Sequence, residues 1–244
     1  MIHAWYERQA TRKNSREPLN WLAQSTDLLP VIPVKLKFKR SLMSAHIPIK
    51  LHAFLTAAQT VFARHSPNEM TVNQEFNRIL DKLRKAPALH GMFQASHHAI
   101  IEHIGVALQH EPKLTKSLLE TITPIAQFLP WRHADVDSGA LSRSSRRAAM
   151  ADIIGPLAPF RSTIVNLGLT LIAPNTLCPS HHHSDAELSH VVTGSATWVI
   201  NGRPLRCQAG TFIATPSQAV HAAHTEHEPL LAIYMRAIQP SVEL

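Results

Sequence analysis

The spacing of apolar residues changes near Arg161, and this change limits the possible folds more than any other feature of the sequence. Beyond this point β-branched and other apolar residues alternate with polar ones, as in strands with one buried face. Turn residues separate the runs, and Asn201-Gly202 is a strong signal for a tight hairpin. We therefore expect a compact antiparallel barrel or sandwich. Its strands are predicted at 162–172, 187–192, 196–200, 210–214 and 230–236.

Before residue 130 the apolar residues recur every three or four positions, which is the period of helices with one buried face. Helices are predicted at about 51–62, 72–83, 100–108 and 118–122. Thr71 and Gln74 form a capping box at the start of the second helix, and Pro124 should end or kink the fourth. A loop and a short helix near 143–153 are expected before the strands begin.

The predicted fold class is α+β, with an N-terminal helical region followed by a C-terminal β-barrel. The helical region is assigned to residues 43–155 and the barrel to residues 156–244. Residues 1–42 are predicted to be a basic, poorly ordered extension, because residues 1–40 hold eight Lys or Arg against three Asp or Glu. The alternative is a targeting or phosphate-binding arm. The rest of the chain is close to neutral, so nucleic-acid binding is not predicted.

The expected cellular compartment depends on two features that the sequence lacks, a disulfide framework and a signal peptide. Two cysteines are too few for a disulfide framework, and no signal peptide is recognisable, so we expect a cytoplasmic protein. No run of about 18 apolar residues is present, so no interaction with a membrane is expected.

Three histidines and a glutamate have the residue types and spacing of a metal site. His181 and His183 are two residues apart and should point the same way on a strand, and Glu187 follows four residues later. His221 would complete the set from a later strand. Imidazole and carboxylate donors together suit one divalent ion of iron, manganese, nickel, cobalt or zinc, and four ligands leave an octahedral ion two open positions. A chance cluster of surface histidines is the alternative.

The spacing of the whole pattern is more specific than the histidines alone. It reads His-x-His, three residues, Glu, six residues, Gly194; then Gly210, five residues, Pro216, four residues, His221. These two blocks resemble the two motifs of the cupin superfamily, whose fold is a double-stranded β-helix, or jelly-roll, barrel. Gln218 stands where the second motif usually has glycine.

Further segments narrow the resemblance to the cupin-type dimethylsulfoniopropionate (DMSP) lyases. The matching segments are Asn-Leu-Gly-Leu-Thr-Leu at 166–171, Leu-Cys-Pro-Ser-His-His-His at 177–183, Gly-Ser-Ala-Thr-Trp at 194–198, Glu-Pro-Leu-Leu-Ala-Ile-Tyr at 228–234 and Leu-Pro-Trp at 129–131. The resemblance implies that an ion held by the four predicted ligands binds the substrate carboxylate. It also implies a β-elimination that yields acrylate and dimethyl sulfide. A homodimer is compatible with it, since cupin barrels often pair.

Two departures from that family concern the catalytic base. Ser189 and Cys178 stand at positions where the family commonly has tyrosines. A serine hydroxyl is a poor base without help, so another proton acceptor is needed. Tyr234 is the first candidate, since metal proximity would lower the pKa of a phenol, and Cys178 as a thiolate is the second. A metal-bound hydroxide is a third alternative.

Aromatic faces can hold a sulfonium cation, and three tryptophan or phenylalanine rings are candidates for substrate binding. They are Trp198, Phe212 and Trp131. For each of them the alternative is packing in the core. The predicted function is a metal-dependent lyase of a small carboxylate, DMSP. The alternatives are an iron-dependent cupin oxygenase or isomerase acting on another small carboxylate, and a ligand-binding cupin without turnover.

Overall fold

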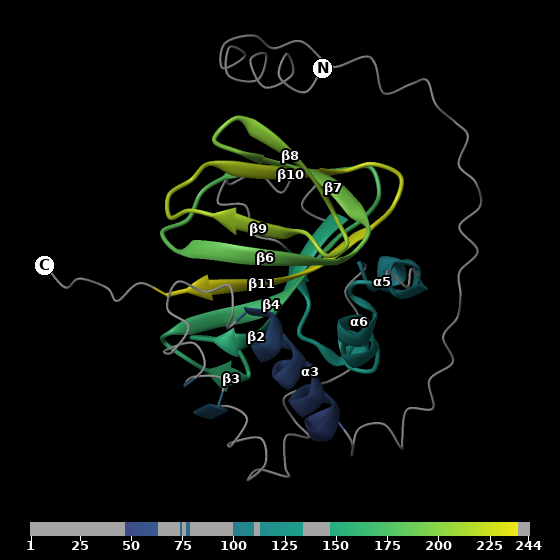
Figure 1. Cartoon of the computed structure of the whole chain (residues 1–244), viewed down its shortest axis with the longest axis vertical. Helices are drawn as coiled ribbons and strands as arrows, with labels where there is room; N and C mark the ends of the chain where they lie inside the picture. Colours follow the sequence, from purple (N-terminus) through teal and green to yellow (C-terminus); the bar gives the residue numbers. More distant parts are fainter. Residues whose placement is uncertain are drawn as a thin grey trace, which may run out of the picture. The chain divides into compact units, whose positions relative to one another are not determined.

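The computed structural model of the protein describes residues 47–62, 74, 77–78, 100–109, 113–133 and 147–238. Two sheets stack on each other, and helices cover the outer face of the larger sheet (Figure 1). Among the helices of these residues, none combines the length and the apolar character that crossing a membrane requires.

The larger sheet has seven strands, which are antiparallel except for the pairing of β3 with β2. Its main path is β1 (Arg132–His133), β2 (Ala148–Gly155), β4 (Val165–Ile172), β11 (Leu230–Ala237), β6 (Ala186–Thr193) and β9 (Phe212–Thr215), with β3 (Phe160–Arg161) beside β2. The smaller sheet has four strands in the order β5 (Thr176–His181), β10 (His221–Thr225), β7 (Ser195–Ile200) and β8 (Arg203–Gln208).

Alternation along β11 divides the core into two parts. Leu231, Ile233 and Met235 pack in the cluster that the large sheet shares with the helices, whereas Leu230 and Ala232 belong to the cluster between the sheets. This follows from the strand period of two, which sends neighbouring side chains to opposite faces. The helices are α3 (Ile47–Phe62), α5 (Ile101–Gln109), α6 (Lys116–Ile122) and the 3₁₀ turn η4 (Ala126–Phe128).

The predicted fold class, helices followed by an antiparallel double-sheet barrel, is confirmed. All five predicted strands are present, with shifts of a few residues at their ends. Asn201 and Gly202 form the hairpin turn between β7 and β8, and both take positive φ, at 47° and 77°. This conformation suits the right-handed twist of the two strands.

One secondary-structure prediction is wrong. The segment at 143–153 was expected to contain a short helix, but residues 148–155 form strand β2. Its alanine-rich sequence has helix propensity, but pairing with β4 and burial of Ala149, Ala151 and Ile153 against the helices decide for the strand. β2 therefore belongs to the large sheet although it lies in the region predicted to be helical.

Two other predictions fall largely outside the described residues. Of the predicted helix at 72–83 only Gln74, Asn77 and Arg78 are described, and all three are helical. The capping hydroxyl of Thr71 and the predicted extension of residues 1–42 lie outside the described residues.

Candidate metal centre and active site

The four predicted metal ligands lie together at one end of the two sheets. His181 is the last residue of β5 and pairs directly with His221, the first residue of β10. His183 follows in the loop, and Glu187 lies on β6 of the other sheet. The ring centroids of His181 and His221 are 4.2 Å apart, those of His183 and His221 5.0 Å, and those of His181 and His183 6.3 Å. The ligand cluster, as we call these four residues, thus draws on both sheets.

The chain does not run as one extended strand from His183 to Glu187. It leaves the small sheet after His181 and enters the large sheet at Ala186. The pairing of β5 with β10 is also irregular, because His181 pairs with His221 whereas Cys178 pairs with Ala223. Three residues of β5 thus span the length of two in β10. This bulge lets both Cys178 and His181 face the inside of the barrel, although they are three residues apart.

Backbone carbonyl groups fix the orientation of all three imidazole rings. Nδ1 lies 3.0 Å from the Pro179 oxygen in His181, 2.7 Å from the Asp185 oxygen in His183 and 2.9 Å from the Ala219 oxygen in His221. Because a carbonyl oxygen only accepts, each Nδ1 carries the proton, and Nε2 of the neutral ring has a free lone pair. Such a carbonyl contact is the usual second partner of a histidine that binds a metal.

Burial keeps two of these rings neutral. Desolvation lowers the pKa of His181, and it lowers the pKa of His221 to about 4, although the carbonyl contacts and Glu187 act in the opposite direction. Neutral rings are the form that binds a metal ion.

Glu187 is buried and bonded at both oxygens. Ser189 donates a hydrogen bond of 2.9 Å to Oε1, and Arg236 Nε donates one of 2.7 Å to Oε2. Burial alone would raise the pKa of this carboxyl group, but the contacts with His183, Arg236 and Ser189 outweigh burial and lower the pKa to about 2. Glu187 is therefore ionised at neutral pH. Ser189 orients the carboxylate through its hydrogen bond to Oε1.

The contact between His183 and Glu187 indicates that the ligand cluster suits a cation. Nε2 of His183 is buried and has no hydrogen-bond partner among the described residues, and it lies 3.5 Å from Oε2 of Glu187. Two acceptor atoms that face each other at this distance form no hydrogen bond without a donor between them. A cation between them would satisfy the lone pair of Nε2 and would also interact favourably with Oε2, which already accepts a hydrogen bond from Arg236.

The donor atoms of the ligand cluster are not arranged around one common position. Within the described ranges, no group of three or more His, Cys, Asp or Glu side chains has the geometry of a bound ion. The ion pair of Glu187 with Arg236 accounts for part of this, since Oε2 already has a cationic partner. The residue types and the free lone pairs of the ligand cluster fit a divalent ion, and small side-chain rotations would be needed to bind it.

Arg236 and Asp152 were not among the predicted residues of this region, but the structure places both beside predicted ones. Arg236 pairs with Glu187 in the register of β11 and β6, and its guanidinium lies 5.2 Å from the centre of the Tyr234 ring. The hydroxyl of Tyr234 donates to Asp152 Oδ1, and Arg132 binds the other oxygen of that carboxylate. A sequence signal existed, because Arg236 and Tyr234 are two apart on one predicted strand, but their partners depend on the register.

The two candidate bases differ in where their reactive groups lie. Tyr234 is fully buried, and its hydroxyl extends over Gly168 on β4 to Asp152 on β2. Glu187 lies on β6, which pairs with the opposite edge of β11. Desolvation, followed by the charge of Asp152, raises the pKa of Tyr234 well above 10. Cys178 packs against the cluster between the sheets, and desolvation raises the pKa of its thiol to about 12.

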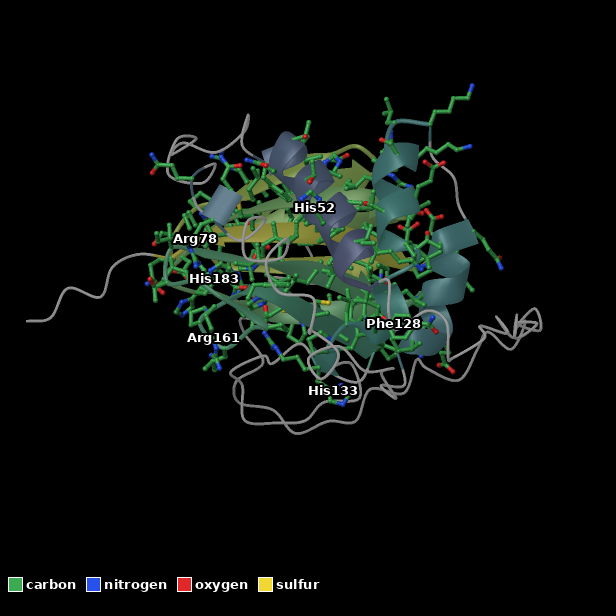
Figure 2. The ribbon with its side chains drawn as sticks, turned by 90° about the horizontal axis from the view of Figure 1, so that it is seen from below. His52, Arg78, Phe128, His133, Arg161 and His183 are labelled. Carbon is green, nitrogen blue, oxygen red and sulfur yellow. The ribbon has the colours of Figure 1, made fainter. Side chains whose placement is uncertain are left out.

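The three aromatic candidates lie on different faces. Trp198 is buried between the sheets, in the same row as Ala223 and Cys178, and its indole N–H has no hydrogen-bond partner within the described ranges. Trp131 packs in the helical cluster and donates to the carbonyl oxygen of Ala126. Figure 2 shows His183 well separated from Phe128, which ends η4 three residues before Trp131.

Phe212 lies on the opposite face of β9 from the ligand cluster. Ile213, the next residue, pairs with Ser189, whereas Phe212 pairs with His190 and contacts its ring at 4.2 Å between centroids. Neither Phe212 nor Trp131 therefore lies on the face that carries Glu187.

Gln218 shows how this chain replaces a motif glycine. It takes a φ of +61°, the left-handed conformation that glycine adopts without cost. Its backbone N–H donates to the carbonyl oxygen of His183 over 2.9 Å. The turn before His221 is thus kept, and it holds the loop that carries His183.

Comparison with known proteins agrees with this architecture. The family model of dimethylsulfoniopropionate lyase matches residues 71–232. A putative DMSP lyase, DddL, of Cereibacter sphaeroides is 26% identical over 153 residues, which are 59% of this chain and 64% of the relative. The chain thus spans slightly less than two thirds of that relative. A gentisate 1,2-dioxygenase of Streptomyces sp. is 27% identical over 99 residues, 39% of this chain and 28% of the relative.

A solved structure described for the DMSP lyases RdDddP and RnDddQII shares the fold. Its TM-score is 0.56 at 19% sequence identity, and the alignment covers 78% of this chain and 92% of that one. The family model covers well over half of the present sequence, from the predicted second helix to strand β11. The chain therefore belongs to the dimethylsulfoniopropionate lyase family.

Proposed function

We propose that this protein is a metal-dependent lyase that cleaves DMSP to acrylate and dimethyl sulfide. The observation that carries the proposal is the pair of facing acceptors, Nε2 of His183 and Oε2 of Glu187, inside a cluster of three carbonyl-oriented histidines. Membership of the family and the putative activity of its relative DddL support the choice of substrate.

His181, His183 and His221 would hold the ion through Nε2, and Glu187 through its carboxylate. Ser189 orients that carboxylate by its hydrogen bond to Oε1. A divalent ion at this place supplies Lewis acidity, which favours loss of a proton from the carbon next to a bound carboxylate group. Iron, manganese, nickel, cobalt and zinc all suit these donors.

The elimination needs an acceptor for the proton next to the carboxylate, while dimethyl sulfide leaves as a neutral group. We favour Cys178 over Tyr234 for this role, because Cys178 faces the barrel interior three residues before His181, whereas the Tyr234 hydroxyl is directed to Asp152. A nearby divalent cation would lower the thiol pKa from its value of about 12. Trp198 lies in the same row as Cys178 and is the aromatic ring best placed to meet the sulfonium.

The experiment is direct. Protein loaded separately with each of the five metals is incubated with DMSP, and dimethyl sulfide is measured in the headspace together with acrylate in solution. We expect both products in equal amounts, no activity in Glu187→Ala and full activity in His182→Ala, because His182 is exposed. Absence of dimethyl sulfide from every fully metallated sample would refute the proposal.

Variants of the two candidate bases complete the test. Cys178→Ser should keep the metal and lose elimination, and Tyr234→Phe should keep both. The opposite pattern would assign the base to Tyr234. An oxygenase is the second candidate, favoured by the absence of the two family tyrosines and by the partial match to a gentisate dioxygenase. Oxygen consumption during turnover would identify it.

A further inference from the structure

Arg236 is a partly buried cation whose hydrogen-bonding capacity is only partly used. Its side chain is 19% exposed, and within the described part of the chain its hydrogen bonding is confined to Nε, which binds Glu187. An arginine carries five N–H donors, four of them on the two terminal nitrogens. These four donors form the edge of the guanidinium that binds a carboxylate through two parallel hydrogen bonds.

The guanidinium is held in place by its neighbours. Glu187 holds Nε from β6, and the Tyr234 ring lies 5.2 Å from the guanidinium carbon. A donor group that is fixed before the ligand arrives loses little entropy on binding. The positive charge also reaches His181, whose pKa it helps to lower. Arg236 is thus a fixed cation beside the ligand cluster.

The neighbouring strand carries another polar group with unused hydrogen-bonding capacity. Asn166 pairs with Arg236 in the register of β4 and β11, and its buried side-chain oxygen has no hydrogen-bond partner in the part of the chain that the structure describes. A buried amide oxygen without a partner is costly unless a ligand or water satisfies it. Two adjacent positions of this sheet therefore carry polar groups that are available to a bound molecule.

We propose that Arg236 anchors the carboxylate group of the substrate through its two terminal nitrogens. The inference deepens the proposed function and rests on it, and it names a small carboxylate as the ligand class. Anchored there, the carboxylate group lies beside Glu187 and the histidines, where the proton next to it must be removed. Arg236 thereby selects anionic ligands over neutral ligands of the same shape.

Binding to acrylate and to acrylamide tests this, because the two molecules share a shape and differ in charge. Zinc-saturated wild-type protein, Arg236→Gln, Arg236→Lys and Ser189→Ala are titrated with each compound by calorimetry. Arg236→Gln should weaken acrylate binding on the order of 10- to 100-fold, the usual effect of losing hydrogen bonds to a charged group, and leave acrylamide binding unchanged. Arg236→Lys should recover part of the loss, since it keeps the charge without the planar pair of donors.

Ser189→Ala is the matched control, because it removes the other hydrogen bond to Glu187 and leaves Arg236 in place. It should lose much less acrylate affinity than Arg236→Gln. An equal loss in Ser189→Ala and Arg236→Gln would show that Arg236 acts only through Glu187 and would overturn the anchor. Unchanged acrylate affinity in Arg236→Gln, or wild-type protein that does not prefer acrylate to acrylamide, would overturn it too. Acrylate binding that depends on Arg236 in a protein that releases no dimethyl sulfide would instead refute the lyase and keep the carboxylate anchor.

Discussion

Replacing Tyr234 by phenylalanine removes one buried hydrogen bond and changes little else. The hydroxyl donates to Asp152 Oδ1, and it also fills the space over Gly168, where an added Cβ would lie 2.6 Å from it. A hydrogen bond to a charged group contributes about 1.5–3 kcal/mol to stability. For a domain of this size each kcal/mol corresponds to about 2–4 °C in Tm, so we expect a decrease of several degrees.

The same carboxylate provides the control. Arg132 binds Asp152 through Nε and Nη2, but its side chain is 42% exposed. An exposed ion pair contributes less than about 1 kcal/mol, so Arg132→Gln should destabilise less than Tyr234→Phe. In a double-mutant cycle, Tyr234→Phe and Asp152→Asn should couple by about 1 kcal/mol, because Asp152→Asn removes the charge that strengthens the hydrogen bond that Tyr234→Phe deletes.

Urea denaturation of metal-free protein measures these differences, and pH adds a second test. The folded-state pKa of Tyr234 lies well above 10 because of desolvation and the charge of Asp152. A pKa raised by folding means that the folded protein keeps the proton more tightly, so stability falls as pH rises above about 10. Tyr234→Phe lacks this loss, and its stability deficit relative to wild type should therefore shrink above pH 10.

Absorbance at 295 nm reports phenolate directly, and the difference between wild type and Tyr234→Phe isolates Tyr234. This difference signal should show no phenolate of Tyr234 in the folded protein near pH 10. Three outcomes would contradict these expectations: a larger loss of stability in Arg132→Gln than in Tyr234→Phe, an additive double-mutant cycle, or a difference signal that titrates at an ordinary tyrosine pKa. That last outcome would also make Tyr234 a stronger candidate for the catalytic base.

Two further predictions concern a turn and the metal. Gly194→Ala should destabilise by about 2–4 kcal/mol, because φ is +80° and the new Cβ would lie 2.0 Å from the carbonyl oxygen of Pro229. Gly202→Ala also has a positive φ, at +77°, but no described atom lies within 4 Å of the new Cβ, so it should lower the free energy of unfolding by about 1 kcal/mol. Equal losses of stability in the two variants, measured by thermal denaturation, would contradict the clash at Gly194. His181→Ala should abolish the rise in Tm on adding zinc, whereas the exposed His182→Ala should keep it; loss of the response in both would contradict the assigned ligands.

The sequence alone determined the strands, the hairpin and the order of the polar residues. Period-two alternation predicted five strands of the barrel, and Asn201-Gly202 predicted the turn between β7 and β8. These signals are local, because side-chain alternation and positive φ belong to a few consecutive residues. The spacing of the motif from His181 to His221 predicted which residues form the ligand cluster, and the pairing of β5 with β10 places His181 beside His221.

Tertiary structure decided the features that depend on pairing between distant segments. It made residues 148–155 a strand, although their alanines favour a helix, because β4 offered a partner and the helices a core. It also set the register that joins Arg236 to Glu187 and lets Tyr234 reach Asp152. A shift of one residue in either strand would turn these side chains to the opposite face, and no local pattern in the sequence specifies that register.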